Sequence, residues 1–255
     1  MTDELRGLRG LVVGVANEHS IAWGCAQACH EAGAELALTW LNDKARPFVE
    51  PLAERIAAPL RLPLDVEQPG QLEAVFEAIA QHWGGLDFLV HSIAFAPRDD
   101  LQGRVVDSSA AGFARAMDVS CHSLLRMARL AEPLMAGGGS IVTMSYLGAE
   151  EVVANYGLMG PVKAALESSV RYLAAELGPR GISVNAVSPG PIATRAASGL
   201  PRFDELLESA RERAPLRRLV DAAEVGALCR FLVSPPGRAL TGNVLYVDGG
   251  LHILG

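Results

Sequence analysis

The sequence has few cysteines and no cluster of metal ligands. Its four cysteines are Cys25, Cys29, Cys121 and Cys229, which are too few and too scattered for the disulfide framework of a small secreted protein. Cys25 and Cys29 are one helical turn apart, but no other Cys/His pair completes a zinc ligand set. We therefore expect reduced, structural cysteines and no metal site.

Basic charge and long apolar runs are also scarce. The chain carries 22 Lys and Arg against 29 Asp and Glu, a formal net charge of −7, whereas a general nucleic-acid binder needs a basic footprint. No stretch of about 20 apolar residues could span a bilayer. The N-terminal Met-Thr-Asp-Glu-Leu-Arg lacks the apolar core of a signal peptide. The expectation is a cytoplasmic protein that binds neither nucleic acid nor membrane.

What the chain of 255 residues does have is a regular alternation of short apolar runs and longer helical patterns. The expected strands are 11–15, 35–40, 60–64, 88–91, 140–145, 183–188 and 244–247. The expected helices are 21–32, 44–56, 71–83, 112–135, 157–177, 203–213 and 222–233. Several apolar runs are continuous, which is typical of strands covered on both faces. The pattern predicts a single α/β domain over residues 1–255, with a doubly wound, Rossmann-like parallel sheet and helices on both faces.

Residues 190–219 interrupt this alternation. They form a long excursion between a strand and the last helix, opening with a Gly-Pro pair and a polar stretch before a short helix. Excursions of this length are usually functional. We expect a substrate-binding lid; a surface insertion is the alternative.

A glycine-bearing turn follows the first strand. Gly14 ends that strand, and Ser20 and Ile21 open the next helix. A glycine lets the backbone approach a pyrophosphate, and a helix N-terminus favours the anion. Ser20 is also suited to capping the helix. A tight turn without a ligand would explain the glycine equally well, because the three-glycine dinucleotide fingerprint is incomplete.

The ends of the next strands offer further polar groups. Asp43 is a candidate partner for an adenosine ribose or a helix cap, whereas Lys44 and Arg46 are suited to a 2′-phosphate. Asp65 and Val66 follow the third strand and suit an adenine edge, with a helix cap as the alternative.

The fourth strand leads into small residues at 92–97, over which a cofactor has room to lie. We interpret His91, which precedes them, as a buried, hydrogen-bonded strand residue.

Tyr156 and Lys163 carry the most chemical information. Seven residues are about two helical turns, which predicts that both side chains, with Met159 between them, lie on one helix face. A lysine ammonium beside a phenol favours the phenolate and eases proton donation. Tyr146 directly follows a strand and is expected at the same rim. A packed phenol, a solvated amine and an aromatic at the rim are the alternatives.

At this point the sequence resembles the short-chain dehydrogenase/reductases, and within them the enoyl-acyl-carrier-protein reductases of bacterial fatty-acid synthesis. The resemblance covers nearly the whole chain. The segments that carry it include the widened glycine loop (14–24), Val-His-Ser-Ile-Ala-Phe-Ala-Pro (90–97), Ser-Tyr-Leu-Gly-Ala-Glu (145–150), Asn-Tyr-Gly-Leu-Met-Gly-Pro-Val-Lys (155–163), Gly-Pro-Ile-Ala-Thr (190–194) and Val-Asp-Gly-Gly (247–250). Most members of the superfamily have Tyr-x3-Lys, whereas this chain has Tyr-x6-Lys.

The resemblance implies a role for each matching position. Residues implied to bind the dinucleotide are Gly14, Ser20, Ile21, Asp65, Val66, Ile93, Lys163, Ile192, Ala193, Thr194, Arg195 and Ala196. Residues implied to border the acyl substrate are Ala96, Tyr146, Tyr156 and Met159. Lys163 would bind the nicotinamide ribose, and Tyr156 would donate to the thioester carbonyl; Tyr156, Tyr146 and Lys163 form the implied catalytic set.

The implied activity is reduction of an enoyl thioester carried by acyl carrier protein, with NADH as cofactor, NADPH as its alternative, and a homotetramer as the assembly. A carbonyl or 3-ketoacyl reductase and a non-catalytic dinucleotide-binding protein are the competing hypotheses. Three residues depart from the family pattern: Leu41 near the adenosine ribose, Arg195 near the substrate, and Pro161 between Tyr156 and Lys163. Proline is tolerated only in a helix's first turn, so we expect the helix to begin within 157–160.

The segment 195–218 is locally basic. It contains six arginines (Arg195, Arg202, Arg211, Arg213, Arg217 and Arg218) against four acidic residues. An acidic carrier protein would be attracted to such a surface. A solvated helix face is the alternative.

Overall fold

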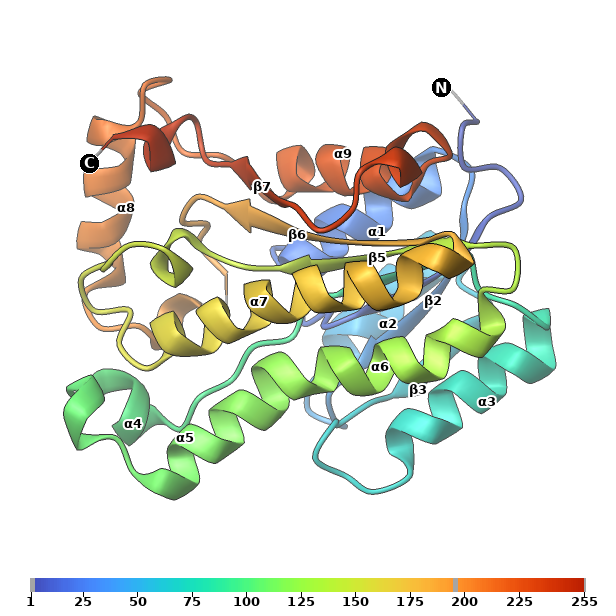
Figure 1. Cartoon of the computed structure of the whole chain (residues 1–255), viewed down its shortest axis with the longest axis horizontal. Helices are drawn as coiled ribbons and strands as arrows, with labels where there is room; N and C mark the ends of the chain where they lie inside the picture. The colour runs from blue at the N-terminus through green and yellow to red at the C-terminus, as the bar shows by residue number, and fades with distance from the viewer. Residues whose placement is uncertain (1–2, 195–196, 255) are drawn as a thin grey trace.

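The computed structural model describes residues 3–194 and 197–254 (Figure 1). They form one seven-stranded, fully parallel sheet in the order β3-β2-β1-β4-β5-β6-β7. Its strands are β1 (Arg9–Val13), β2 (Glu35–Trp40), β3 (Leu60–Pro63), β4 (Phe88–His91), β5 (Gly139–Met144), β6 (Ile182–Pro189) and β7 (Val244–Val247). The strand order reverses between β1 and β4, which opens a crevice at the carboxyl ends of these strands. The doubly wound fold expected from the sequence is confirmed.

Helices cover both faces of the sheet. They are α1 (Ile21–Glu31), α2 (Arg46–Arg55), α3 (Gln71–Trp83), α4 (Arg98–Gln102), α5 (Ala110–Met117), α6 (Ser123–Ala131), α7 (Met159–Leu177), α8 (Phe203–Arg213) and α9 (Ala222–Val233). Between them lie a π-helical segment, η2 (Asp118–His122), and single 3₁₀ turns at η1 (Val105–Asp107), η3 (Glu132–Leu134), η4 (Leu147–Ala149), η5 (Gly178–Arg180), η6 (Ala197–Gly199), η7 (Pro236–Ala239) and η8 (Leu251–Ile253). Figure 1 shows α1 and α9 on one face, α3, α6 and α7 on the other, and α4 and α8 beyond the carboxyl edge.

Two apolar cores sandwich the sheet. In β1, Val12 packs toward α1, α2 and α9, whereas Leu11 and Val13 pack toward α3, α6 and α7. Successive side chains of a strand point to opposite faces. Continuous apolar runs such as this one are therefore needed to fill both cores.

Two predicted elements differ most in the structure, and several others shift by one or two residues at an end. The first strand ends at Val13 rather than 15, because Gly14 has φ +101° and turns the chain out of the sheet. The predicted helix 112–135 is divided into α5, η2 and α6. Within η2 the buried Ser120 hydroxyl bonds the backbone of Phe95, a side-chain contact that periodicity does not reveal.

The start of α7 confirms the expectation drawn from Pro161. The helix begins at Met159, so the proline lies in its first turn, where the missing N–H costs nothing. Tyr156 therefore precedes the helix. The prediction that Tyr156 and Lys163 share one helix face is wrong, although both reach the same cleft as described below.

Membrane-spanning helices are not found among residues 3–194 and 197–254, since none combines the needed length with the needed apolar character.

Close packing of α1 against α9 generates a test of the fold. A Cβ on Gly226 would lie 2.3 Å from the Gly24 carbonyl oxygen, whereas a Cβ on Gly178 would meet nothing within 4 Å. Gly226→Ala should lower the free energy of unfolding by about 1–3 kcal/mol. Gly178→Ala, at a helical φ of −53°, should be neutral or slightly stabilising. Urea unfolding measures both; equal stabilities would contradict this packing.

Candidate active site

A deep cleft opens at the carboxyl ends of β1, β4, β5 and β6. It encloses about 1120 Å³ of empty space, counting the solvent at its mouth. The residues that line it include Gly14, Ala16, Ser20, Ile21, Ser92, Ile93, Ala94, Phe95, Ala96, Leu101, Met144, Ser145, Tyr146, Tyr156, Met159, Lys163, Ile192, Thr194, Leu200, Phe203 and Leu206. Most are apolar, so the few polar groups among them decide its chemistry.

The glycine loop forms the floor of the cleft beside β1. A Cβ on Gly14 would lie 2.0 Å from the carbonyl oxygen of Ser92, so only glycine fits where the loop crosses β4. The Ser20 hydroxyl donates to the carbonyl of Asn17 (2.7 Å) and accepts from the N–H of Ala16 (3.4 Å). Ser20 thus stabilises the loop and does not cap α1 through its side chain, which corrects the expected capping. The N-terminus of α1 opens into the cleft and is suited to a pyrophosphate.

Lys163 projects from α7 into the interior. Its side chain is buried, and Nζ donates to the carbonyl oxygen of Met144 at 2.6 Å. Burial lowers the pKa of Lys163 to about 8, against a smaller opposing effect of Cys121 and Glu167. The bond attaches the first turns of α7 to the end of β5.

A second side-chain bond joins the same two elements. The Ser145 hydroxyl donates to a carboxylate oxygen of Glu167, and both residues are buried. Burial is also the main cause that raises the pKa of Glu167. The sequence prediction missed Glu167; its position four residues after Lys163, on the same helix face, was the available signal.

Tyr146 and Tyr156 meet over the cleft. Their ring centroids are 4.7 Å apart and the rings are tilted by 55°. Tyr156 is placed by a left-handed turn, because Asn155 (φ +64°) and Gly157 (φ +55°) flank it. Gly148 leaves room for its ring, since a Cβ there would lie 2.3 Å from Tyr156 Cδ1. A turn, not a shared helix face, therefore brings Tyr156 to the cleft with Lys163.

Both phenols remain protonated at neutral pH. Burial raises the pKa of Tyr146 to about 12. The pKa of Tyr156 is raised further, by burial first and then by Tyr146 and Glu167. A neutral phenol in an apolar cleft is a hydrogen-bond donor aimed at any oxygen that gains negative charge there.

His91 lies outside the cleft, within the sheet. Its Nδ1 is 2.9 Å from Thr143 Oγ1 and its Nε2 is 2.8 Å from Ser123 Oγ, and burial lowers its pKa to about 3. It is the buried strand residue that the sequence predicted.

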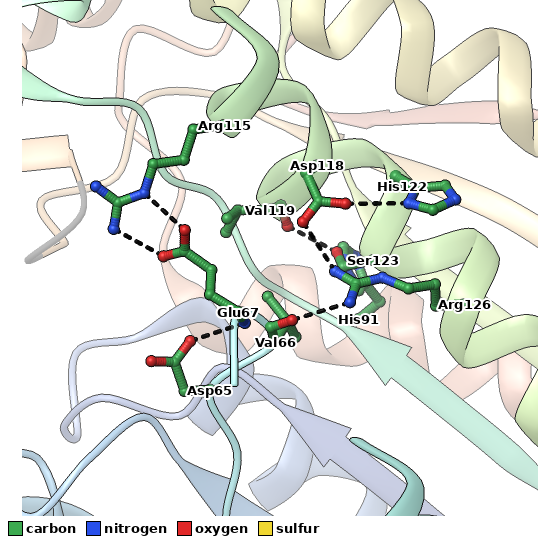
Figure 2. Close-up of polar contacts among 10 residues, drawn as sticks. All are labelled: Asp65, Val66, Glu67, His91, Arg115, Asp118, Val119, His122, Ser123 and Arg126. Carbon is green, nitrogen blue, oxygen red and sulfur yellow. Dashed lines mark hydrogen bonds and ion pairs between the residues drawn. The ribbon is translucent and has the colours of Figure 1, made fainter. Parts of the chain in front are cut away.

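Asp65 and Val66 lie beyond the cleft lining, at the end of β3. An Asp65 carboxylate oxygen accepts from the N–H of Glu67 (3.0 Å), and the Val66 carbonyl accepts from Arg126 (2.9 Å) (Figure 2). Asp65 is not the helix cap named as the alternative, because α3 has Gly70 at its N-cap. Ala193 is exposed and lies outside the lining. Arg195 and Ala196 fall outside the described residues.

The other predicted site residues line one cleft: Gly14, Ser20, Ile21, Ile93, Ala96, Tyr146, Tyr156, Met159, Lys163, Ile192 and Thr194. The sequence prediction missed Phe203 and Leu206 of α8, whose apolar side chains at i and i+3 were the available signal.

Metal-ligand clusters of three or more His, Cys, Asp or Glu are not found in the described part of the chain. The four cysteines are free and buried, as predicted.

A doubly wound parallel sheet whose carboxyl edge holds a glycine loop, and a buried lysine and two tyrosines in the lining of one cleft, is the arrangement of an oxidoreductase of the short-chain dehydrogenase/reductase class. The sequence profile described as Enoyl-(Acyl carrier protein) reductase matches residues 14–252. The chain belongs to this family of enoyl-acyl-carrier-protein reductases.

Individual relatives are similar over most or all of their length. The Enoyl-[acyl-carrier-protein] reductase [NADH] 1 of Rhizobium meliloti is 49% identical, with 98% of this chain and 92% of the relative covered. The Anaplasma phagocytophilum enzyme, solved in complex with NAD, has a TM-score of 0.96 at 44% identity and covers 100% of this chain and 97% of its own. The Bacillus cereus enzyme, solved with NADP+ and indole naphthyridinone, has a TM-score of 0.97 at 47% identity and covers 100% of both chains.

The lowered pKa of Lys163 predicts a pH-dependent stability. Between pH 8 and 10 the unfolded chain keeps a proton on Lys163 that the folded chain has lost, so stability rises with pH. Lys163→Met should remove this rise, which amounts to at most about 2 kcal/mol over that interval. Urea unfolding of both proteins from pH 7 to 10 measures the difference; parallel stability curves would contradict the burial of a titrating ammonium.

Proposed function

We propose that this chain reduces the trans-2 double bond of enoyl thioesters carried by acyl carrier protein, with NADH, during fatty-acid elongation. The observation that supports this most is the contact of Tyr146 and Tyr156, two protonated phenols, in the one apolar cleft that the buried Lys163 also lines. A bound NADH would supply the hydride for the β-carbon of the substrate. The glycine loop at Gly14 is suited to hold its pyrophosphate, and the Lys163 ammonium is suited to hold its nicotinamide ribose.

The reaction places charge away from the carbon that is reduced. When hydride reaches the β-carbon, negative charge develops on the thioester oxygen, further along the conjugated system. Tyr156 donates its hydroxyl hydrogen bond to that oxygen, and a proton from solvent then adds at the α-carbon. A ketone reductase needs its tyrosine next to the hydride donor, so the longer Tyr-x6-Lys spacing favours enoyl reduction.

The remaining cleft residues hold the two reactants. Ile21, Ile93, Ile192 and Thr194 would contact the dinucleotide, while Asp65 and Val66 would meet its adenine. Ala96, Tyr146 and Met159 would border the acyl chain.

We further propose that residues 190–219 form the lid over the substrate, since Leu200, Phe203 and Leu206 line the cleft from within that segment.

The side chains of Arg46 and Leu41, which follow β2, support NADH rather than NADPH as the cofactor. Arg46 donates to both carboxylate oxygens of Glu50, at 2.9 and 3.2 Å, and lies over Trp40. Its guanidinium is therefore already engaged rather than directed at a 2′-phosphate. Leu41 is exposed beside it and offers no polar group.

We place the enzyme in the cytoplasm as a homotetramer. Large apolar side chains that remain exposed on α9 and on the C-terminal turn support an assembly: Phe231 and Ile253. Exposed aromatic and aliphatic side chains of this kind are typical of interface anchors.

Removing one hydroxyl tests the catalytic proposal. The wild-type chain should oxidise NADH when given a crotonyl thioester, and Tyr156→Phe should lower kcat roughly ten- to hundred-fold, the value of one hydrogen bond to a developing charge. Tyr172→Phe, on the exposed face of α7, is the control and should keep full activity. Undiminished turnover in Tyr156→Phe, or a response to ketones only, would refute the proposal.

The basic segment generates a test of carrier docking. Arg211 is exposed on α8, where it pairs with Glu208 at 2.9 Å. Arg211→Glu should raise KM for an acyl-carrier-protein substrate about five-fold more than for its coenzyme A analogue, because rim charges attract a charged partner. Arg6→Glu is the matched control, since Arg6 is an exposed arginine that pairs with Asp3 three residues away. An equal loss for both substrates would exclude docking at α8.

A further inference from the structure

Arg115, near the end of α5, contacts two segments that follow different strands. Its Nε and Nη2 donate to the two carboxylate oxygens of Glu67 at 2.7 and 2.8 Å (Figure 2). Its Cζ also lies 4.5 Å from the centre of the Phe95 ring. A planar guanidinium can satisfy both contacts at once, whereas a lysine ammonium cannot.

The first contact holds the turn that follows β3. Within this turn Glu67 is bound to the Asp65 carboxylate through its N–H, and Val66 is bound to Arg126 through its carbonyl. Arg126 also pairs with Asp118 at 3.2 Å (Figure 2). The turn is therefore attached at two points, Arg115 and Arg126, to the helical segment that α5, η2 and α6 form.

The second contact covers a wall of the cleft. The buried Ser120 hydroxyl accepts from the Phe95 N–H at 2.8 Å and donates to the Phe95 carbonyl at 2.9 Å. The main chain of Phe95 is therefore fixed, and its ring is the part that can adjust. Arg115 covers one face of that ring, and Phe95 lines the cleft.

We propose that Arg115 is a positioning residue that couples the adenine-binding turn to the substrate cleft. The inference rests on the proposed function, in which Asp65 and Val66 meet the adenine. A nucleotide that restrains this turn restrains Glu67, and Arg115 transmits the restraint to Phe95 in the cleft lining. Such coupling is reciprocal between the two ligands. Exposed ion pairs add little to folding stability. Loss of the Arg115–Glu67 pair should therefore change ligand affinity rather than the free energy of unfolding.

Kinetics of Arg115→Ala, Glu67→Ala and the double variant test the coupling. At saturating NADH, each single variant should raise KM for a crotonyl thioester about five-fold with kcat within about two-fold. The double variant should raise KM no more than the larger single effect, because the two residues act in series. Arg115→Lys should behave like Arg115→Ala. An unchanged KM in Glu67→Ala would overturn the proposal, since Glu67 lies outside the cleft and reaches it through Arg115.

The matched control is Arg180→Ala. Arg180 pairs with Glu132 at 2.8 Å, and the two side chains are 45% and 31% exposed, close to the 50% and 32% of Arg115 and Glu67. Arg180 precedes β6 at the edge of the sheet opposite the cleft. Its loss should leave KM unchanged, and a rise equal to that of Arg115→Ala would overturn the proposal.

Titration with ADP separates this inference from the proposed reductase activity. ADP carries the adenosine half of the dinucleotide and no nicotinamide, so its binding needs no turnover. Arg115→Ala should weaken ADP binding about five-fold relative to wild type and Arg180→Ala. ADP affinity that is the same in all three proteins overturns the role of Arg115. Lack of NADH oxidation by the wild type would instead count against the enoyl reduction.

Discussion

The site depends on one buried hydrogen bond, from the Lys163 ammonium to the Met144 carbonyl. It joins α7 to the end of β5, and the Ser145 hydroxyl bonded to Glu167 joins the same elements one helical turn further along. A charge in the interior is costly unless it is hydrogen-bonded. Lys163 is therefore held in one place, and the strand end that carries Tyr146 is held with it.

This arrangement produces a cleft whose few polar groups include one ammonium and two phenols that can donate hydrogen bonds. Burial that lowers the pKa of Lys163 raises the pKa of Tyr146 and Tyr156. The three groups respond in opposite directions to the same loss of water, because each favours its neutral form. Such a cleft suits the formation of an enolate from a thioester. Hydrogen-bond donors that are already fixed in a water-excluded site stabilise the negative charge on the oxygen without having to reorganise.

Much of the fold could be predicted from the sequence because its signals are local. Strands β2, β4 and β7 and helices α3, α8 and α9 have the predicted bounds. The helix predicted over 112–135 is present from Ala110 to Ala131. The π-helical segment within it could not be predicted, because the contact of Ser120 with Phe95 is tertiary and leaves no periodic trace. Tyr156 and Lys163 do reach one cleft, but through the turn at Asn155 and Gly157 rather than along a helix. Glu167 was missed because a buried carboxylate looks like a solvated one in sequence.

A crystal structure of the chain with NAD+ and a saturated acyl thioester tests the central claim most directly. The account predicts Lys163 Nζ within hydrogen-bond distance of both the Met144 carbonyl and the nicotinamide ribose, with the Tyr156 hydroxyl on the thioester oxygen. A ribose out of reach of Lys163, with the Tyr156 hydroxyl turned away from the thioester, would contradict it.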